Sequence, residues 1–267
     1  MPLAVCATPI GNLEDVTLRV LAELREAELV LCEDTRHTRV LLDRHGLRDV
    51  RLLSYHEHNE AARTAELLPR LLDGERMALV SDAGMPGVSD PGARIVRAAL
   101  DAGVPVTVLP GPSAVETALV ASGFGGGPFR FLGFLPRGAA ALAAVWTEVR
   151  EVAVAFESPQ RLPATLRSLA AVEPERPAAV CRELTKRFEE VARGRAAELA
   201  ERFAEPPKGE LVLVLGPSQS AVSATDEEAA LAAVADLVEA GVPRRRAAEI
   251  VSRLTGVSRN RLYRGSL

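Results

Sequence analysis

Short apolar runs alternate with helical patterns along the first part of the chain. These runs are rich in branched residues and bounded by turn residues, which is typical of strands buried in a sheet. A rhythm of strand, helix and strand predicts a parallel α/β sheet. The four runs are Leu3–Ala7, Leu29–Cys32, Met77–Val80 and Val104–Leu109.

Two helices are predicted between these strands. The first carries an apolar stripe at helical spacing, and Asn12 stands where a helix cap is expected. The second opens at Asp90-Pro91-Gly92, with proline at its first position, and ends near Gly103. The stripe of the first helix consists of Leu13, Val16, Val20, Leu24 and Ala27.

The alternation begins again after Ser113, and 267 residues exceed what one hydrophobic core usually organises. We therefore expect an N-terminal lobe over 1–115, a C-terminal lobe over 116–220 and a helical module over 225–267. The second lobe has strand candidates at Phe129–Phe134, Val152–Phe156, Ala178–Cys181 and Leu211–Leu215, and helices near 159–171 and 195–203. The module has one helix over about 226–239 and a second helical pattern after Gly241-Val242-Pro243.

The composition is that of a globular protein, with 48% hydrophobic and 25% charged residues. No apolar run approaches the roughly 20 residues of a membrane span, and the N-terminus lacks the basic leader of a secretion signal. We therefore expect a cytoplasmic protein without a membrane partner. Cys6, Cys32 and Cys181 stand far apart in apolar stretches, which favours buried thiols over a zinc or redox motif.

A net charge of −4 looks unfavourable for nucleic-acid binding, but the charge is unevenly distributed. The last 26 residues hold seven arginines and one glutamate, a net +6, which leaves −10 on the other 241 residues. Two helical stretches around Thr255-Gly256-Val257-Ser258 with basic faces are typical of a small nucleic-acid-binding module; a basic dimerisation helix is the alternative. The candidate RNA-binding residues are Arg244, Arg245, Arg246, Arg253, Arg259, Arg261 and Arg264.

The loop from Ser81 to Gly92 holds three glycines, two prolines and two aspartates between a strand and a helix. Ligands of open α/β sheets bind at such carboxyl ends, and glycine lets the backbone approach them closely. An elaborate turn is the alternative. Pro110–Ala114 repeats the design at a helix N-terminus, which suits an anionic group. Neither loop is a phosphate-binding Gly-Lys-Ser/Thr motif, so ATP hydrolysis is disfavoured.

Three further polar segments follow predicted strands or loops. Glu33–Arg39 is either a ligand site or a solvated helix start. His56 and His58 lack a third ligand at a suitable spacing, so we expect no metal site. Arg182–Arg187 carries basic groups that either meet an anionic substrate or pair with neighbouring glutamates.

Taken together, these motifs resemble the ribosomal small-subunit RNA (cytidine-2′-O)-methyltransferases of the tetrapyrrole methylase superfamily. The resemblance spans essentially the whole chain, and one local departure is Glu157–Arg161, where a histidine is expected before the arginine. The motifs, in family order, are Ala7–Asp15, Glu33–Arg36, Ser81–Gly92, Leu109–Ala114, Gly133–Pro136, Arg182–Lys186 and Lys208–Glu210.

The resemblance implies a class III methyltransferase fold, in which two α/β lobes hold S-adenosylmethionine in a cleft and a small helical module follows. It also implies a homodimer that methylates a cytidine 2′-hydroxyl in the decoding region of small-subunit ribosomal RNA. We expect the substrate to be an assembled 30S particle. The implied cofactor contacts are Pro9, Ser81, Asp82, Gly84, Val88, Ser113, Ala114, Leu132, Phe156, Arg182 and Gly209.

A ribose hydroxyl is a weak acid, so a base that accepts its proton assists the reaction. Our hypothesis is that Glu33 or Asp34 is this base, with Arg36 or Lys186 on the neighbouring phosphate. Three alternatives stay open: a porphyrinoid or corrinoid methylase, a diphthamide-pathway methylase with a protein substrate, and a non-catalytic nucleic-acid-binding regulator.

Overall fold

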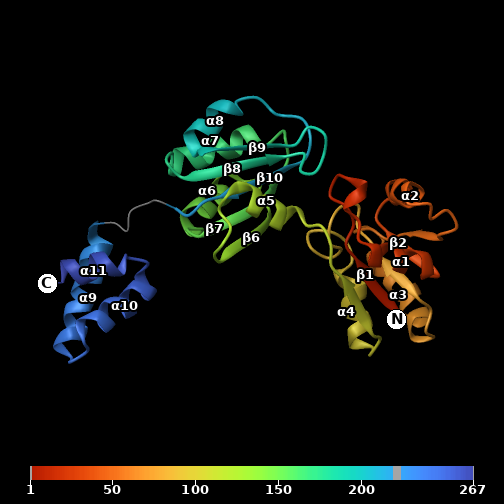
Figure 1. Ribbon diagram of the computed structural model, residues 1–267, viewed down its shortest axis with the longest axis horizontal. Helices are drawn as coiled ribbons and strands as arrows, with labels where there is room; N and C mark the ends of the chain where they lie inside the picture. The colour runs from red at the N-terminus through yellow and green to blue at the C-terminus, as the bar shows by residue number, and fades with distance from the viewer. Residues whose placement is uncertain (1, 219–223, 267) are drawn as a thin grey trace. The chain divides into compact units, whose positions relative to one another are not determined.

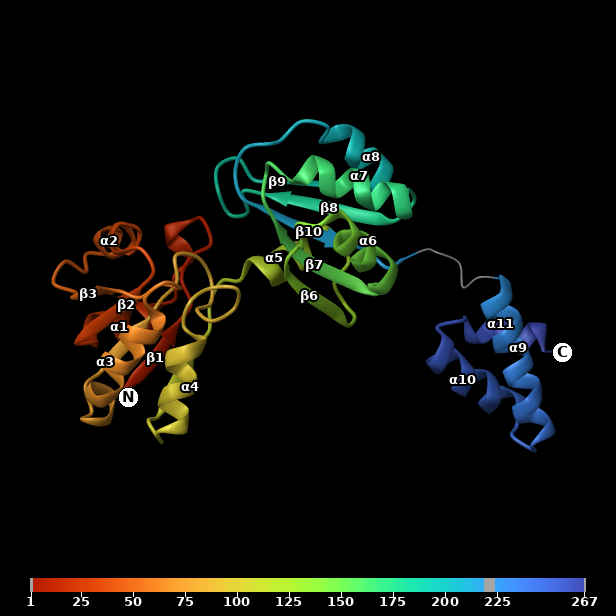
Figure 2. The ribbon, with the colours of Figure 1, turned by 180° about the vertical axis from the view of Figure 1, so that it is seen from behind.

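The computed structural model describes residues 2–218 and 224–266, which form two compact units (Figures 1 and 2). The first unit ends at Pro217 and contains two five-stranded sheets. The second begins at Ser218 and is helical. Within the described residues, no helix combines the length and the apolar character that crossing a membrane requires.

The first sheet is wholly parallel, with strand order β3-β2-β4-β1-β5. Helices α1 and α2 pack on one face and α3 and α4 on the other, so the central strands are apolar on both sides. The strands are β1 (Leu3–Cys6), β2 (Leu29–Cys32), β3 (Leu52–Ser54), β4 (Met77–Leu79) and β5 (Val106–Leu109). The helices are α1 (Leu18–Glu26), α2 (Thr35–Arg44), α3 (Glu60–Leu72) and α4 (Ala93–Asp101).

The second sheet is mixed, with strand order β6-β7-β10-β8-β9, and only β6 and β7 are parallel. Helices α6, α7 and α8 cover one face, and α5 packs on the other. The strands are β6 (Phe129–Phe134), β7 (Val152–Glu157), β8 (Pro177–Arg182), β9 (Glu190–Arg195) and β10 (Leu211–Leu215). The helices are α5 (Ala114–Ser122), α6 (Ala139–Glu148), α7 (Leu162–Val172) and α8 (Ala196–Arg202).

The second unit is a three-helix module with its own core. The helices are α9 (Ala224–Glu239), α10 (Arg244–Thr255) and α11 (Arg259–Gly265). Val234 of α9, Val251 of α10 and Leu262 of α11 are fully buried against one another. Gly256 ends α10 with a left-handed φ of 74°, which glycine adopts without strain.

Two helices start differently from the sequence prediction. Asn12 caps only a short 3-10 turn, Leu13–Asp15, because its side chain accepts a hydrogen bond from Glu14 N at 3.1 Å. Val16 is extended, with ψ 141°, and Thr17 then caps α1. Likewise α4 begins at Ala93, so Pro91 stands before the helix rather than at its first position.

The core of the second lobe is centred on Trp146 of α6, which is fully buried and donates from Nε1 to Ser168 Oγ at 3.0 Å. We expect Trp146→Ala to lower the free energy of unfolding by about 3–5 kcal/mol, because a large cavity replaces the indole. The control is Val120→Ala, at a site that is 75% exposed, which should change the free energy of unfolding by under about 0.5 kcal/mol. Equal midpoints in chemical denaturation would contradict this role.

Candidate functional site

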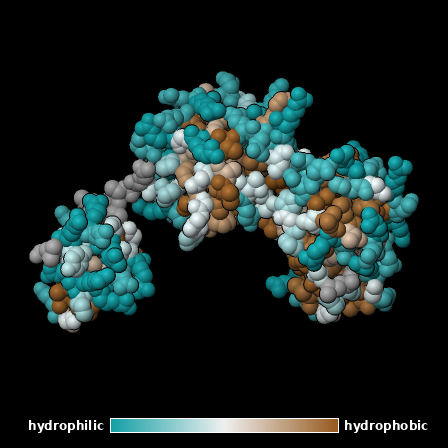
Figure 3. Space-filling view, in the orientation of Figure 1, coloured by the Kyte–Doolittle hydropathy of each residue, from teal (hydrophilic) through white to brown (hydrophobic). Residues whose placement is uncertain are grey.

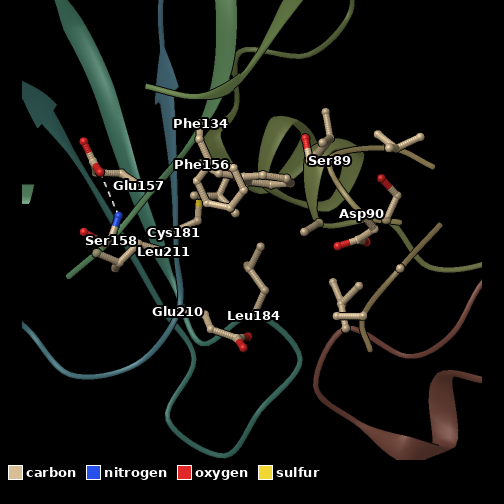
Figure 4. Close-up of a pocket in the computed structure, with 18 of the residues that line it drawn as sticks. Ser89, Asp90, Phe134, Phe156, Glu157, Ser158, Cys181, Leu184, Glu210 and Leu211 are labelled. Carbon is tan, nitrogen blue, oxygen red and sulfur yellow. Dashed lines mark hydrogen bonds between the residues drawn. The ribbon is translucent and has the colours of Figure 1, made fainter. Parts of the chain in front are cut away.

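A cavity of about 410 Å³ lies between the loops that follow β4 and β5 of the first sheet and the strand ends of the second (Figure 4). Gly84, Met85, Val88, Ser113 and Ala114 line it from the first sheet's loops. Its other wall is formed by residues of β6, β7, β8 and β10 and the loops beside them. This is the position at which open α/β sheets hold ligands.

The loop after β4 is held in shape by its own backbone. Thr8 and Gly84 exchange two backbone hydrogen bonds, of 2.8 and 3.1 Å, which fix the loop against the end of β1. Gly92 has a φ of 133°, and a Cβ there would lie 2.8 Å from Leu79 Cδ2. Only glycine fits this position, which explains the glycine that precedes α4. Ser89 also has a positive φ, 63°, at the edge of the cavity.

The opposite wall is apolar and aromatic. The rings of Phe134 and Phe156 pack with their centroids 5.4 Å apart. Cys181 and Leu211 continue the wall, and Leu184 borders the cavity beside Glu210 (Figure 4). Such a wall suits a ligand that presents a flat ring or an apolar chain.

The charge of the lining is entirely negative. Asp90, Glu157 and Glu210 contribute carboxylates, and no lysine, arginine or histidine lines this cavity within the described residues. Burial, together with the charges of Glu33 and Asp82, raises the pKa of Asp90 to about 6. The cavity is therefore suited to a ligand with a positive charge.

A smaller, more polar cavity of about 170 Å³ adjoins the first and shares Ile10, Ala83 and Glu210 with it. His37 Nδ1 lies 3.6 Å from Asp82 Oδ2 there. On the side of the second sheet, Lys186 Nζ lies 2.7 Å from Glu210 Oε2. This cavity therefore presents side chains of both signs.

The loops after β1 and β8 meet beside this smaller cavity. Asn12 N donates to Thr185 Oγ1 at 3.1 Å, and a Cβ on Gly11 would lie 2.6 Å from Lys186 Cγ. Glu183 and Thr185 both have positive φ, 52° and 65°. This strained turn positions Lys186 next to the first lobe.

The predicted cofactor contacts fall into three groups. Six line the larger cavity, three line the smaller one, and two line neither. The first group is Gly84, Val88, Ser113, Ala114, Phe156 and Gly209, and the second is Pro9, Ser81 and Asp82. Leu132 packs against the core of the second lobe, and Arg182 pairs with Glu190 at 2.9 Å and donates to Lys208 O.

The four predicted catalytic residues have different surroundings. Glu33 follows β2, half-buried, and burial and the charge of Asp82 raise its pKa. Asp34 caps α2, and hydrogen bonds from Arg36 lower its pKa to about 2. The Arg36 side chain is 90% exposed, whereas Lys186 borders the smaller cavity. Glu33 is thus the better proton acceptor of the two carboxylates.

The basic module exposes most of its arginines, and its visible surface is predominantly hydrophilic (Figure 3). Arg244 is half-buried, and Arg246 pairs with Glu249 at 3.0 Å. The exposed arginines are Arg245, Arg246, Arg253, Arg259, Arg261 and Arg264.

Asp90, Phe134 and Glu157 are lining residues that the sequence prediction left out of the site. Asp90 stands inside the glycine-rich loop and Phe134 inside the Gly133–Pro136 motif, so both had a local signal. Glu157 ends β7 next to the predicted contact Phe156, and the pairing of β7 with β10 brings it to the cavity.

The thiols and histidines offer no sign of a metal centre in the described part of the chain. Cys6, Cys32 and Cys181 are all buried and free, and burial raises the pKa of Cys181 to about 11. No group of three or more His, Cys, Asp or Glu side chains among the described residues is arranged to hold a metal ion.

Comparison with known proteins extends these observations. Residues 2–200 match the family described as tetrapyrrole (corrin/porphyrin) methylases. The chain is 44% identical to "Ribosomal RNA small subunit methyltransferase I" of Mesorhizobium japonicum, over 98% of this chain and 90% of that protein. It is also 44% identical to the Thermotoga maritima protein of the same name, over 80% of this chain and 97% of that protein.

A solved structure shares the fold of most of the chain. Uroporphyrin-III C-methyltransferase from Thermus thermophilus, in complex with S-adenosylhomocysteine, superposes with a TM-score of 0.56. The match has 21% identity and covers 80% of this chain and 96% of that one. The two-lobed α/β fold expected from the sequence is thereby confirmed.

Proposed function

Since the chain belongs to the tetrapyrrole methylase family, and within it to the small-subunit ribosomal RNA methyltransferases, we propose that it methylates a cytidine 2′-hydroxyl of that RNA. The observation that carries this proposal is the 44% identity to the Mesorhizobium protein over nearly the full length of both chains. The methyl donor is S-adenosylmethionine, whose demethylated product is bound in the Thermus structure.

The larger cavity fits this donor. Its lining carries three carboxylates without a basic group, and the donor carries a positive sulfonium. Phe134 and Phe156 supply an apolar wall for its adenosine, and Gly84 lets the backbone come close to it. When bound, the donor supplies an activated methyl group, so the chain has mainly to align the ribose oxygen with that group.

Glu33 is our candidate for accepting the proton of the 2′-hydroxyl. It is half-buried, takes part in no ion pair within the described residues, and has a raised pKa. Asp34, the other candidate, is engaged by Arg36 and by the start of α2. We assign Asp34 and Arg36 to shaping the start of α2, and Lys186 to contact with a phosphate of the RNA.

The basic module is our candidate for RNA docking. Its exposed arginines carry charge that phosphates neutralise, and the rest of the chain is acidic. The match to the Thermotoga protein leaves about a fifth of this chain uncovered, close to the share of the 50 residues of the second unit. This correspondence supports a role for the module in RNA docking that is separate from the catalytic site in the first unit.

Three further features belong to the proposal. The acidic first unit favours a folded 30S particle over free RNA, because the particle offers a defined site for the last 26 residues, whose net charge is +6. Two copies of the chain form the active homodimer, as the family resemblance implies. The reaction takes place in the cytoplasm, where ribosomal subunits are assembled.

Incubation of the full chain with isotopically labelled S-adenosylmethionine and unmethylated small subunits tests the proposal. We expect label in the small-subunit RNA and none in a matched reaction with a porphyrinoid acceptor. Label in the porphyrinoid alone, or in ribosomal protein, would establish a different methylase on the same fold. Donor binding without transfer to any acceptor would favour a non-catalytic regulator.

A further inference from the structure

The larger cavity holds three carboxylates, and two of them are already engaged by the protein. Glu157 accepts hydrogen bonds from Thr165 Oγ1 at 2.6 Å and from Ser158 N at 2.8 Å, and lies 3.3 Å from Arg161. Glu210 pairs with Lys186. The charge of Glu157 is therefore balanced by Arg161, and that of Glu210 in part by Lys186, which also lies 3.0 Å from Glu183.

Asp90 is different. It is half-buried at the edge of the cavity, and no ion pair involves it within the described residues. The Ser81 side chain lowers the pKa of this carboxylate, whereas the charged groups that act on it, Glu33 and Asp82, are also acidic and raise it. A carboxylate in such surroundings is stabilised by a cationic ligand more than by anything the chain itself supplies.

The surroundings of Asp90 also favour a cation over an uncharged ligand. Asp90 lies on the opposite side of the cavity from Glu157 and Ser158, and Phe134 and Phe156 border the space between them (Figure 4). Aromatic faces attract positive charge through their quadrupole. The Asp90 carboxylate and the aromatic wall would therefore both attract the positive charge of a ligand in this cavity.

We propose that Asp90 is the counter-charge of the cofactor's sulfonium and determines the preference of the cavity for S-adenosylmethionine over S-adenosylhomocysteine. This inference rests on the proposed function. The two compounds differ by the methyl group and by the sulfonium charge, because sulfur keeps the electron pair of the broken carbon–sulfur bond. Their amino and carboxyl groups are identical, so a group that separates them must sense the charge or the methyl group.

Asp90 also has a consequence for product release. Once the sulfonium charge is gone, the product lacks the charge that the Asp90 carboxylate attracts, so it is held less tightly than the donor. The pKa of Asp90, about 6 without ligand, makes the preference depend on pH. Below that value Asp90 is protonated and uncharged, so the preference for the sulfonium grows as the pH rises through 6.

Calorimetric titration of the full chain with both compounds tests this assignment. We expect Asp90→Asn to weaken S-adenosylmethionine binding about tenfold and to leave S-adenosylhomocysteine binding unchanged. Sinefungin, which carries an ammonium group in place of the sulfonium, should follow S-adenosylmethionine. Asp101→Asn, the same change at an exposed site in the last turn of α4, is the matched control.

The outcomes are distinguishable. Equal weakening of both compounds would assign Asp90 to the shared amino group or to the loop, and no weakening would leave it without a role; either result overturns the inference. A wild-type chain that binds neither compound would refute the proposed function instead. The ratio of the two affinities in the wild type, measured from pH 5 to 8, needs no variant, and a flat ratio also overturns the inference.

Discussion

Replacing Glu33 by glutamine is expected to lower the rate of methyl transfer by about 10²–10⁴-fold, the usual contribution of a general base. Glutamine keeps the size of the side chain but cannot accept the proton of the ribose hydroxyl. The side chain is half-buried beside Asp82 and His56, so the change removes a charge that the chain does not neutralise by an ion pair. Binding of S-adenosylmethionine should change less than turnover, because Glu33 does not line the larger cavity and acts on it only through the charge of Asp90.

The pH dependence provides a second measurement of the same role. Burial raises the pKa of Glu33, and the base must be ionised to act. Wild-type turnover at saturating substrates should therefore rise with pH through a pKa above the ordinary value of a glutamate and then level off. Glu33→Gln should lack this rise.

Asp34→Asn is the comparison for both measurements. Its carboxylate caps α2 and binds Arg36, so asparagine, itself a good helix cap, should leave most of the turnover in place. If Asp34→Asn abolished turnover and Glu33→Gln spared it, the proton acceptor would be Asp34. Near-wild-type turnover of both variants would show that neither Glu33 nor Asp34 accepts the proton.

Removing four charges from the basic module is expected to weaken binding to small subunits by about 10²–10³-fold at 0.1 M salt. Each phosphate contact to a single strand contributes roughly 0.7 to the slope of log K against log salt concentration, so four contacts contribute a slope of about 2.8. Between 1 M and 0.1 M salt, this slope corresponds to about 2.8 powers of ten in the binding constant. The substitutions are Arg245→Gln, Arg253→Gln, Arg259→Gln and Arg264→Gln, all at exposed positions outside the module core.

Four exposed arginines of the first unit provide a control with the same change in net charge. They are Arg25, Arg48, Arg94 and Arg97. Their replacement by glutamine should leave the salt slope nearly unchanged, and both variants should bind S-adenosylmethionine as the wild type does. An unchanged slope in the module variant would assign the module to contact between copies of the chain.

Buried apolar runs were sufficient to predict most of the strands. β1, β2 and β4 lie inside the first sheet, and their side chains are apolar because both faces are covered. β5 was predicted as well, although it is an edge strand and its Val108 is 55% exposed. The prediction missed β3 and β9, whereas it found β5 and β6, the other two edge strands. β9, Glu190–Arg195, is mostly polar because much of it faces solvent, so it has no apolar run.

The parts of the site that lie within one sequence segment could be predicted, whereas contacts between distant segments could not. The glycines of the loop from Ser81 to Gly92 were enough to predict a ligand site, and residues of this loop line both cavities. The role that we propose for Asp90 depends instead on its surroundings, since the charged groups that act on it within the described residues, Glu33 and Asp82, are both acidic. The contact of Gly11 with Lys186 joins loops that are 175 positions apart in the sequence, which local patterns cannot show.

Digestion of the methylated small-subunit RNA to nucleosides, followed by mass spectrometry, tests the central claim most directly. We expect the full chain, S-adenosylmethionine and unmethylated small subunits to yield 2′-O-methylcytidine, with the methyl group on the ribose. A methyl group on the base, on another nucleoside, or on no nucleoside at all would contradict it.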